Sequence, residues 1–125
     1  MTKLLLVARD REPLSALASA LAQDEDVSLS WAESGGQALA LAAEEPPHLV
    51  VTAEELGDMT GLELVRRLLA VSVTINFAAL SSLSARDFHE ASEGLGIMAQ
   101  LPLRPGPEQA QKLLQRLKKM QVFPQ

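Results

Sequence analysis

The sequence predicts an α/β fold built on a five-stranded parallel sheet. Two observations support this prediction. Short apolar runs alternate with segments whose apolar residues recur at i, i+3, i+4 and i+7, and the connections between them are short. Hydrophobic residues make up 47% of the 125 residues and charged residues 22%, as in a globular chain with a substantial core. We expect residues 1–125 to form a single domain.

Five segments have the pattern of strands. The first is a continuous apolar run, which is typical of a strand buried on both faces. The second alternates Val27, Leu29 and Trp31 with serines, which indicates one more polar face. The predicted strands cover residues 4–7, 27–32, 48–52, 73–79 and 97–101.

Five further segments have the pattern of helices. Pro13 and Pro107 suit the first turn of a helix, Ser84 suits an N-cap, and Pro46 ends the second helix. Gly94 and Gly96 close the fourth helix, which starts after Ser84. The residues expected to be buried are, helix by helix, Leu14, Leu17, Ala18 and Leu21; Ala38, Leu39, Leu41 and Ala42; Leu62, Val65, Leu68 and Leu69; Phe88 and Ala91; and Ala110, Leu113, Leu114 and Leu117.

Composition excludes several classes of function. The net charge of −5 and the pI near 5.0 argue against nucleic-acid binding, which needs a basic surface. Without cysteine there is no disulfide, no thiol catalysis and no cysteine-ligated zinc, and two histidines make a multi-histidine metal site improbable. No apolar run reaches the roughly 18 to 20 residues of a membrane span. We therefore expect a soluble, cytoplasmic protein that needs no cofactor.

Four stretches in this order resemble one known family. They are residues 3–7, 32–39, 47–51 leading to 59–64, and 101–103. Together they resemble the response-regulator receiver domain, the flavodoxin-like module of bacterial two-component signalling. The resemblance implies a three-layer sandwich whose five parallel strands have the order 2-1-3-4-5, with five flanking helices.

The resemblance also implies a chemistry at the carboxyl ends of the strands. In the family, two acidic residues after the first strand and an aspartate after the third strand hold magnesium. That aspartate accepts a phosphoryl group from the histidine of a partner kinase. A threonine or serine after the fourth strand and a lysine after the fifth strand bind the new phosphoryl oxygens, and an aromatic residue near the fifth strand acts as a switch.

This sequence departs from the family at each of those positions. Where the acidic pair is expected stand Ala8 and Arg9, followed by one carboxylate, Asp10. Ala53 lies eight residues before Gly61, at the position of the acceptor. The other substituted positions are Ala79 for the hydroxyl, Leu101 for the lysine and Met98 for the switch residue. The resemblance therefore predicts a degenerate phosphorylation pocket, without catalytic residues or a metal site, in a pseudo-receiver.

Three alternatives for the charged residues remain open. A shift of register by one residue would make Glu54 or Glu55 the functional acid. Glu54 could instead imitate a phosphorylated aspartate, although a carboxylate carries less charge than a phosphoryl group. Arg9 could take the place of the metal ion and pair with Asp10 or Glu54.

The predicted function is that of a non-catalytic signalling module, not an enzyme, which acts through protein–protein contacts. Its partner would be a signalling protein, either a histidine kinase or a downstream effector of a phosphorelay, or a second copy of the chain. The residues that the resemblance suggests for this contact are Phe88, Met98, Gln100, Lys112, Arg116 and Lys119. The alternatives are a phospho-accepting response regulator that uses a non-standard acidic site, and a pseudo-receiver that senses a small ligand.

Overall fold

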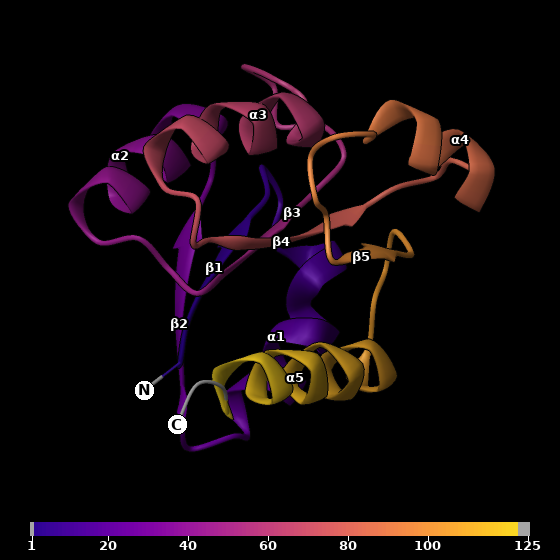
Figure 1. The fold of residues 1–125 in the computed structure, drawn as a ribbon. Coiled ribbons are helices and arrows are strands. Elements are labelled where there is room, and N and C mark those ends of the chain that lie inside the picture. Colours follow the sequence, from indigo (N-terminus) through magenta and orange to yellow (C-terminus); the bar gives the residue numbers. More distant parts are fainter. Residues whose placement is uncertain (1, 123–125) are drawn as a thin grey trace.

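The computed structural model describes residues 2–122, and its centre is a five-stranded parallel sheet (Figure 1). The strand order is β2-β1-β3-β4-β5, which confirms the predicted order and leaves β2 and β5 at the edges. The strands are β1 (Thr2–Val7), β2 (Val27–Ala32), β3 (Leu49–Thr52), β4 (Asn76–Leu80) and β5 (Ala99–Leu101).

Helices cover both faces of the sheet (Figure 1). Helices α1 and α5 lie against one face, and α2 and α3 lie against the other, with α4 beyond α3 on the same side. A short 3₁₀ turn, η1 (Glu12–Leu14), leads into α1. The α-helices are α1 (Ser15–Ala22), α2 (Gly35–Glu44), α3 (Gly61–Val71), α4 (Ala85–Ala91) and α5 (Pro107–Val122).

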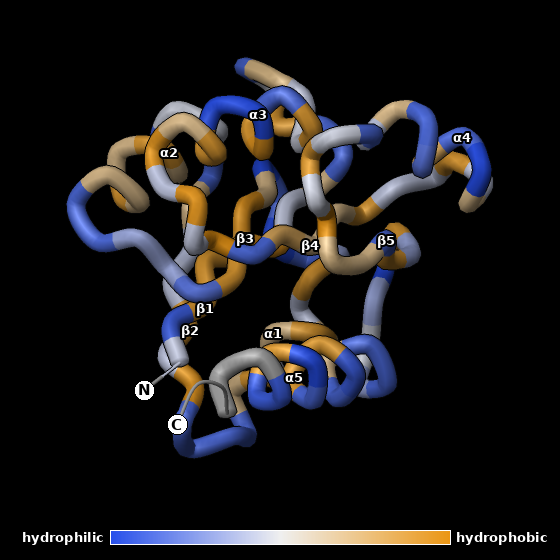
Figure 2. The backbone as a smooth tube through the Cα atoms, viewed as in Figure 1, coloured by the Kyte–Doolittle hydropathy of each residue, from blue (hydrophilic) through white to orange (hydrophobic). Residues whose placement is uncertain are grey.

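Successive residues of each central strand point to opposite faces, so the protein has two hydrophobic cores. Leu4 and Leu6 of β1 pack toward α1 and α5, whereas Leu5 and Val7 pack toward α2 and α3. The hydropathy colouring shows the same division, with apolar strands at the centre and polar residues on the outward turns of the helices (Figure 2). This double burial explains why the strand segments are continuous apolar runs in the sequence.

Several predicted boundaries and buried positions were wrong. Val73 is 88% exposed, because β4 begins only at Asn76, whose backbone pairs with Leu49 at the start of β3. Strand β5 likewise begins at Ala99 and not at residue 97. Leu41 was expected in the buried face of α2 but is exposed, because Ala38 and Ala42, four residues apart, face the sheet.

Helix α4 begins after Ser84, as predicted, because the Ser84 hydroxyl accepts a hydrogen bond from the backbone N–H of Asp87. It ends at Ala91, which is exposed and not buried as expected. Gly94 and Gly96 follow in left-handed conformations, with φ of 85° and 67°, which glycine adopts without strain. Phe88 is the one residue that this helix buries.

No helix within residues 2–122 has both the length and the apolar character needed to cross a lipid bilayer.

Helix α3 starts unusually close to the end of β3. The Thr60 hydroxyl caps it by accepting a hydrogen bond from the backbone N–H of Glu63. A Cβ atom on Gly61 would lie 2.3 Å from the carbonyl oxygen of Ala53 and 3.0 Å from the side chain of Thr52. Position 61 therefore requires glycine for reasons of space, and this close approach fixes the loop that lies between Ala53 and Gly61.

We predict that Gly61→Ala lowers the free energy of unfolding by about 1–3 kcal/mol, because the backbone carbonyl of Ala53 or the start of α3 must move to admit the methyl group. Urea unfolding followed by circular dichroism measures the change. Gly36→Ala in α2 is the matched control, because its added Cβ meets its nearest neighbour, Asp58 Oδ2, at 3.5 Å. The control should be neutral or stabilising, by up to about 1 kcal/mol. Equal losses in both variants would contradict the packing argument.

Candidate functional site

The carboxyl ends of β1 and β3 lie side by side, which brings the predicted site residues together. The backbone N–H of Ala53 donates to the carbonyl of Val7 over 2.9 Å, so Ala53 lies next to the start of the β1–α1 loop. A shallow cavity of about 450 Å³ opens there. Its lining consists of Ala8, Arg9, Asp10, Pro13, Ala53 and Glu55.

The chemistry of this cavity differs from that of a cation site. The methyl group of Ala53 neither ionises nor coordinates an ion. Asp10 and Glu55 provide carboxylates, and each accepts a hydrogen bond from a nearby backbone N–H, that of Glu12 and that of Gly57 respectively. Arg9 adds a positive charge to the same lining. Magnesium prefers six oxygen ligands in octahedral geometry, and these residues do not fit it.

The pairing of Arg9 with Asp10 or Glu54, one of the three open alternatives, is not formed among the described residues. Within residues 2–119, the Arg9 guanidinium forms no ion pair with either carboxylate. Its side chain lies over Gly57, where an added Cβ would meet Arg9 Cδ at 3.1 Å. Gly57 has a φ of 89°, so the loop after β3 turns beneath the arginine at this residue.

Glu54 is bound by two serines and is not a free loop carboxylate. Its Oε2 accepts hydrogen bonds from the backbone N–H of Ser82 at 2.9 Å, from the Ser82 hydroxyl at 3.0 Å and from the Ser81 hydroxyl at 3.5 Å. Its Oε1 accepts from the Ser82 hydroxyl at 3.2 Å. Glu54 therefore ties the end of β3 to the loop between β4 and α4.

The structure corrects the position assigned to the hydroxyl after the fourth strand. Ala79 lies inside β4, where it pairs with Thr52 on one side and Gln100 on the other. The hydroxyl at the strand end belongs to Ser81, which is buried and donates its backbone N–H to the carbonyl of Leu101. Ser81 lies 20 positions before Leu101, whereas Ala79, the position predicted for the hydroxyl, lies 22 positions before it. The signal in the sequence was the serine pair directly after the apolar run 77–80.

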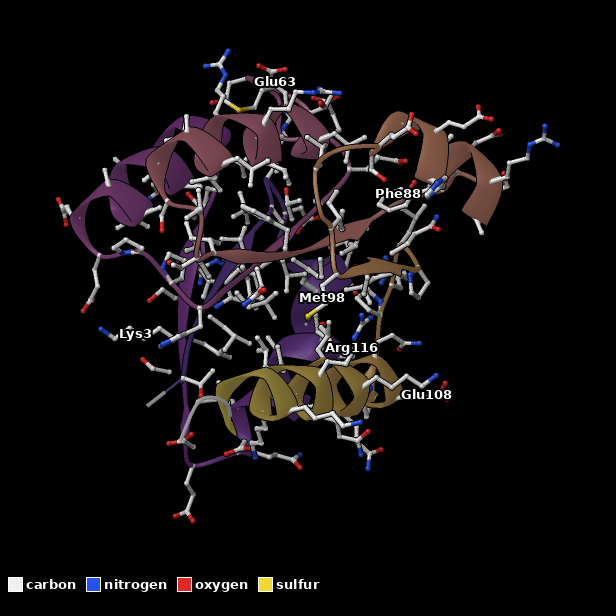
Figure 3. The ribbon with its side chains drawn as sticks, viewed as in Figure 1. Lys3, Glu63, Phe88, Met98, Glu108 and Arg116 are labelled. Carbon is white, nitrogen blue, oxygen red and sulfur yellow. The ribbon has the colours of Figure 1, made fainter. Side chains whose placement is uncertain are left out.

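Leu101 and Met98 belong to the core on the α1–α5 side of the sheet. Leu101 is 4% exposed and packs in this core, so an apolar side chain occupies the end of β5. Met98 is partly buried against the same core. Its carbonyl accepts a hydrogen bond from Arg116 Nη1 of α5 at 2.6 Å, and Figure 3 shows both residues between β5 and α5.

The loop between β4 and α4 is held from two sides. Glu54 binds it from the end of β3 through Ser82, as described above. From β5, the side-chain amide of Gln100 donates to the carbonyl of Leu83 over 2.7 Å. Inside the loop, the Ser81 hydroxyl accepts a hydrogen bond from the backbone N–H of Leu83. These contacts position the start of α4, although none of the side chains involved was identified for this role from the sequence.

The residues suggested for partner contact differ in accessibility. Phe88 is 7% exposed, and its position on α4 is labelled in Figure 3. Its ring is therefore not available to a partner in this conformation, which corrects its expected place on the contact surface. Lys112, Arg116 and Lys119 of α5 are exposed, whereas Gln100 of β5 is partly buried. A cavity of about 320 Å³ lies between β5 and α5, lined in part by Gln100, Lys112 and Arg116.

The fold agrees with the comparison with known proteins. The sequence profile of the response regulator receiver domain matches residues 5–118. The chain belongs to this family. The receiver domain is 30% identical over 112 residues to the uncharacterized transcriptional regulatory protein YesN of Bacillus subtilis. That match covers 87% of this chain but spans only 30% of the length of YesN.

Solved structures share the fold at lower sequence identity. The chemotaxis response regulator CheY4 of Vibrio cholerae matches this receiver domain with a TM-score of 0.80 and 23% identity, over 94% of this chain and 98% of the other. The N-terminal domain of an uncharacterized protein of Wolinella succinogenes matches with a TM-score of 0.83 and 19% identity, over 98% of both chains. At these identities the likeness shows the fold alone: a flavodoxin-like, five-stranded parallel sheet.

A second carboxylate in the loop after β3 fastens that loop to α2. The two oxygens of Asp58 accept hydrogen bonds from the backbone N–H groups of Gly35 and Gly36, at 3.0 and 2.9 Å. These bonds to the charged form hold the pKa of Asp58 below its ordinary value of 3.8. Because the pKa is lowered in the folded state, the contact stabilises the protein above pH 3.8 and its contribution is lost as the pH falls through the lowered value.

We predict that Asp58→Asn destabilises the receiver domain at pH 7, because an amide oxygen replaces only one of the two acceptors. The difference from the wild type should shrink below pH 3.8, as the wild-type carboxyl becomes protonated. Urea unfolding at a series of pH values measures this. Glu93→Gln, at an exposed residue after α4, is the control and should show a smaller pH-dependent difference. A constant difference between Asp58→Asn and the wild type down to pH 2.5 would contradict the assignment.

Proposed function

We propose that this receiver domain is a pseudo-receiver: a signalling module, not an enzyme, that accepts no phosphoryl group at the usual position and acts through protein–protein contacts. The observation that carries the proposal is Ala53, which follows the last residue of β3 where the family has its acceptor. An alanine methyl group cannot form an acyl phosphate. A phosphorylation signal therefore has no covalent point of entry at this residue.

The surroundings of Ala53 support the same conclusion. Arg9 brings a positive charge to the cavity in which the family binds a cation, and like charges repel. Leu101 replaces the family lysine with a buried hydrocarbon side chain, so this position offers no charge to a phosphoryl oxygen. The Ser81 hydroxyl corresponds to the threonine or serine that the family has after the fourth strand, and it donates to Glu54 Oε2.

A phospho-accepting site at a neighbouring acid is the weaker candidate. Glu54 is held toward the loop between β4 and α4 by Ser81 and Ser82, and it does not line the shallow cavity. Glu55 lines the shallow cavity, but its Oε1 accepts a hydrogen bond from the backbone N–H of Gly57. Glu54 therefore lies outside the shallow cavity, and Glu55 lies in it beside the positive charge of Arg9.

Helix α5 supplies the contact surface in this proposal. Lys112, Arg116 and Lys119 are exposed on it, while the chain as a whole has a net charge of −5. A local positive surface on an acidic protein favours an acidic partner. That partner is a signalling protein, either a histidine kinase or a downstream effector, or a second copy of this acidic chain; a nucleic acid would be repelled by the overall charge.

We predict that the domain gains no phosphoryl group when it is incubated with acetyl phosphate and magnesium, because Ala53 offers no acceptor oxygen. Intact-mass spectrometry at neutral pH measures this, with CheY4 of Vibrio cholerae treated in parallel as the reagent control. A stoichiometric, hydroxylamine-sensitive gain of one phosphoryl group would overturn the proposal. Glu54→Gln and Glu55→Gln would then identify which acid accepts it.

We predict that the double substitution Lys112→Glu and Lys119→Glu weakens binding to the partner at least tenfold, and that added salt weakens wild-type binding. Calorimetry with candidate histidine kinases and effectors, and sedimentation for self-association, provide the readouts. Arg66→Glu with Arg67→Glu makes the same charge change on α3, on the opposite side of the sheet, and should leave binding unchanged. Equal effects of both double substitutions would contradict a specific role for α5.

A further inference from the structure

A second cavity lies beneath α4, on the other side of Ala53 from the shallow one. Its volume is about 200 Å³. For comparison, an apolar protein cavity of about 150 Å³ holds a benzene molecule. The cavity is bordered by the carboxyl ends of β3 and β4 and by the first turns of α3 and α4. Its lining consists of Ala53, Glu54, Thr60, Gly61, Leu62, Ala79, Leu80, Ser81, Leu83 and Phe88.

Most of this lining is hydrocarbon, and one residue in it carries charge. Leu62, Leu83 and Phe88 line the space from three different segments, together with small residues such as Ala53 and Ala79. Glu54 is the charged residue among the described residues that line the cavity. An apolar wall with one carboxylate is complementary to a small molecule that has an apolar body and one positive head group.

The two oxygens of Glu54 are unequally occupied. Oε2 accepts from three donors of Ser81 and Ser82, whereas Oε1 accepts from the Ser82 hydroxyl alone, at 3.2 Å. A carboxylate oxygen can accept about two hydrogen bonds, so Oε1 can accept one more. Oε1 can therefore accept an ammonium N–H while Oε2 keeps its bond to the backbone of Ser82.

Helix N-termini near the cavity create a competing preference for anions, because their backbone N–H groups carry partial positive charge. Helices α3 and α4 both begin there. Each, however, is capped by a hydroxyl, from Thr60 and Ser84, and each carries an acidic residue in its first turn, Glu63 and Asp87. These four groups offset the partial positive charges at the N-termini of the two helices. The negative charge of Glu54 then favours a positively charged ligand.

We propose that this cavity binds a small organic cation: a single aromatic ring or short branched chain that carries a primary ammonium group. The ammonium donates to Glu54 Oε1, and the apolar body lies between Leu62, Leu83 and Phe88. Because α4 buries only Phe88 of its own residues, a ligand that contacts this ring acts directly on the position of α4. The proposal does not depend on the absence of phosphorylation at Ala53, so either one can fail alone.

The first experiment uses three probes of one shape and different charge: benzylamine, benzyl alcohol and phenylacetate. Each is titrated into the isotope-labelled protein while amide chemical shifts are recorded. Benzylamine should give saturable shifts with millimolar affinity at Leu62, Ser82, Leu83 and Phe88, as expected for a ligand of this size. Benzyl alcohol should bind at least threefold more weakly, and phenylacetate more weakly still.

The second experiment removes the charge. Glu54→Gln should abolish the preference for benzylamine over benzyl alcohol, because the amide keeps an acceptor for the Ser82 N–H but loses the negative charge. Glu55→Gln, which lines the shallow cavity, is the matched control and should keep the preference. The amide spectrum of each variant shows whether the fold is retained.

Four results would overturn the proposal, and the first three concern benzylamine and the site of binding. They are the absence of saturable shifts with benzylamine, equal affinity of the wild type for all three probes, and shifts centred on Ala8, Arg9 and Asp10 in place of the residues beneath α4. Tighter binding of phenylacetate than of benzylamine would also overturn it, and would show that the helix N-termini outweigh Glu54.

Discussion

Leu4, Leu5, Leu6 and Val7 are all buried because β1 is an interior strand of a sheet that helices cover on both faces. Parallel strands need helical crossovers, and the crossovers place α1 and α5 on one face and α2 and α3 on the other. The same arrangement brings the carboxyl ends of β1, β3 and β4 to one edge. Both cavities beside Ala53 exist because those three ends meet there.

At that edge, hydrogen bonds of three side chains hold the loops in place. Glu54 binds Ser82, Gln100 binds the carbonyl of Leu83, and Asp58 binds the start of α2. Gly61 lets α3 begin against the carbonyl of Ala53. Each of these contacts joins a loop to a neighbouring strand, loop or helix. The result is an edge whose shape is set by the chain itself, with one negatively charged group, Glu54, facing an apolar space.

The fold could be predicted from the sequence because alternation and helical periodicity are local properties. The apolar run 4–7 indicated a doubly buried strand, and Ser84 indicated the start of α4. Predictions that depended on a neighbouring segment were less successful. Val73 lies outside the sheet because β3, its potential partner, begins only at Leu49. Leu41 is exposed because the short side chains of Ala38 and Ala42 face the sheet.

The sequence by itself determined the strand order, through its resemblance to a family, and the identity of the residues at Ala8, Ala53 and Leu101. The tertiary structure decided which groups meet at these positions. In the structure, the hydroxyl at the end of β4 is that of Ser81. The Arg9 side chain lies over Gly57, and the Glu54 carboxylate accepts a hydrogen bond from Ser82. Such contacts join residues that are distant in the chain, as Glu54 and Ser82 are, and their geometry depends on loop lengths that local patterns do not fix.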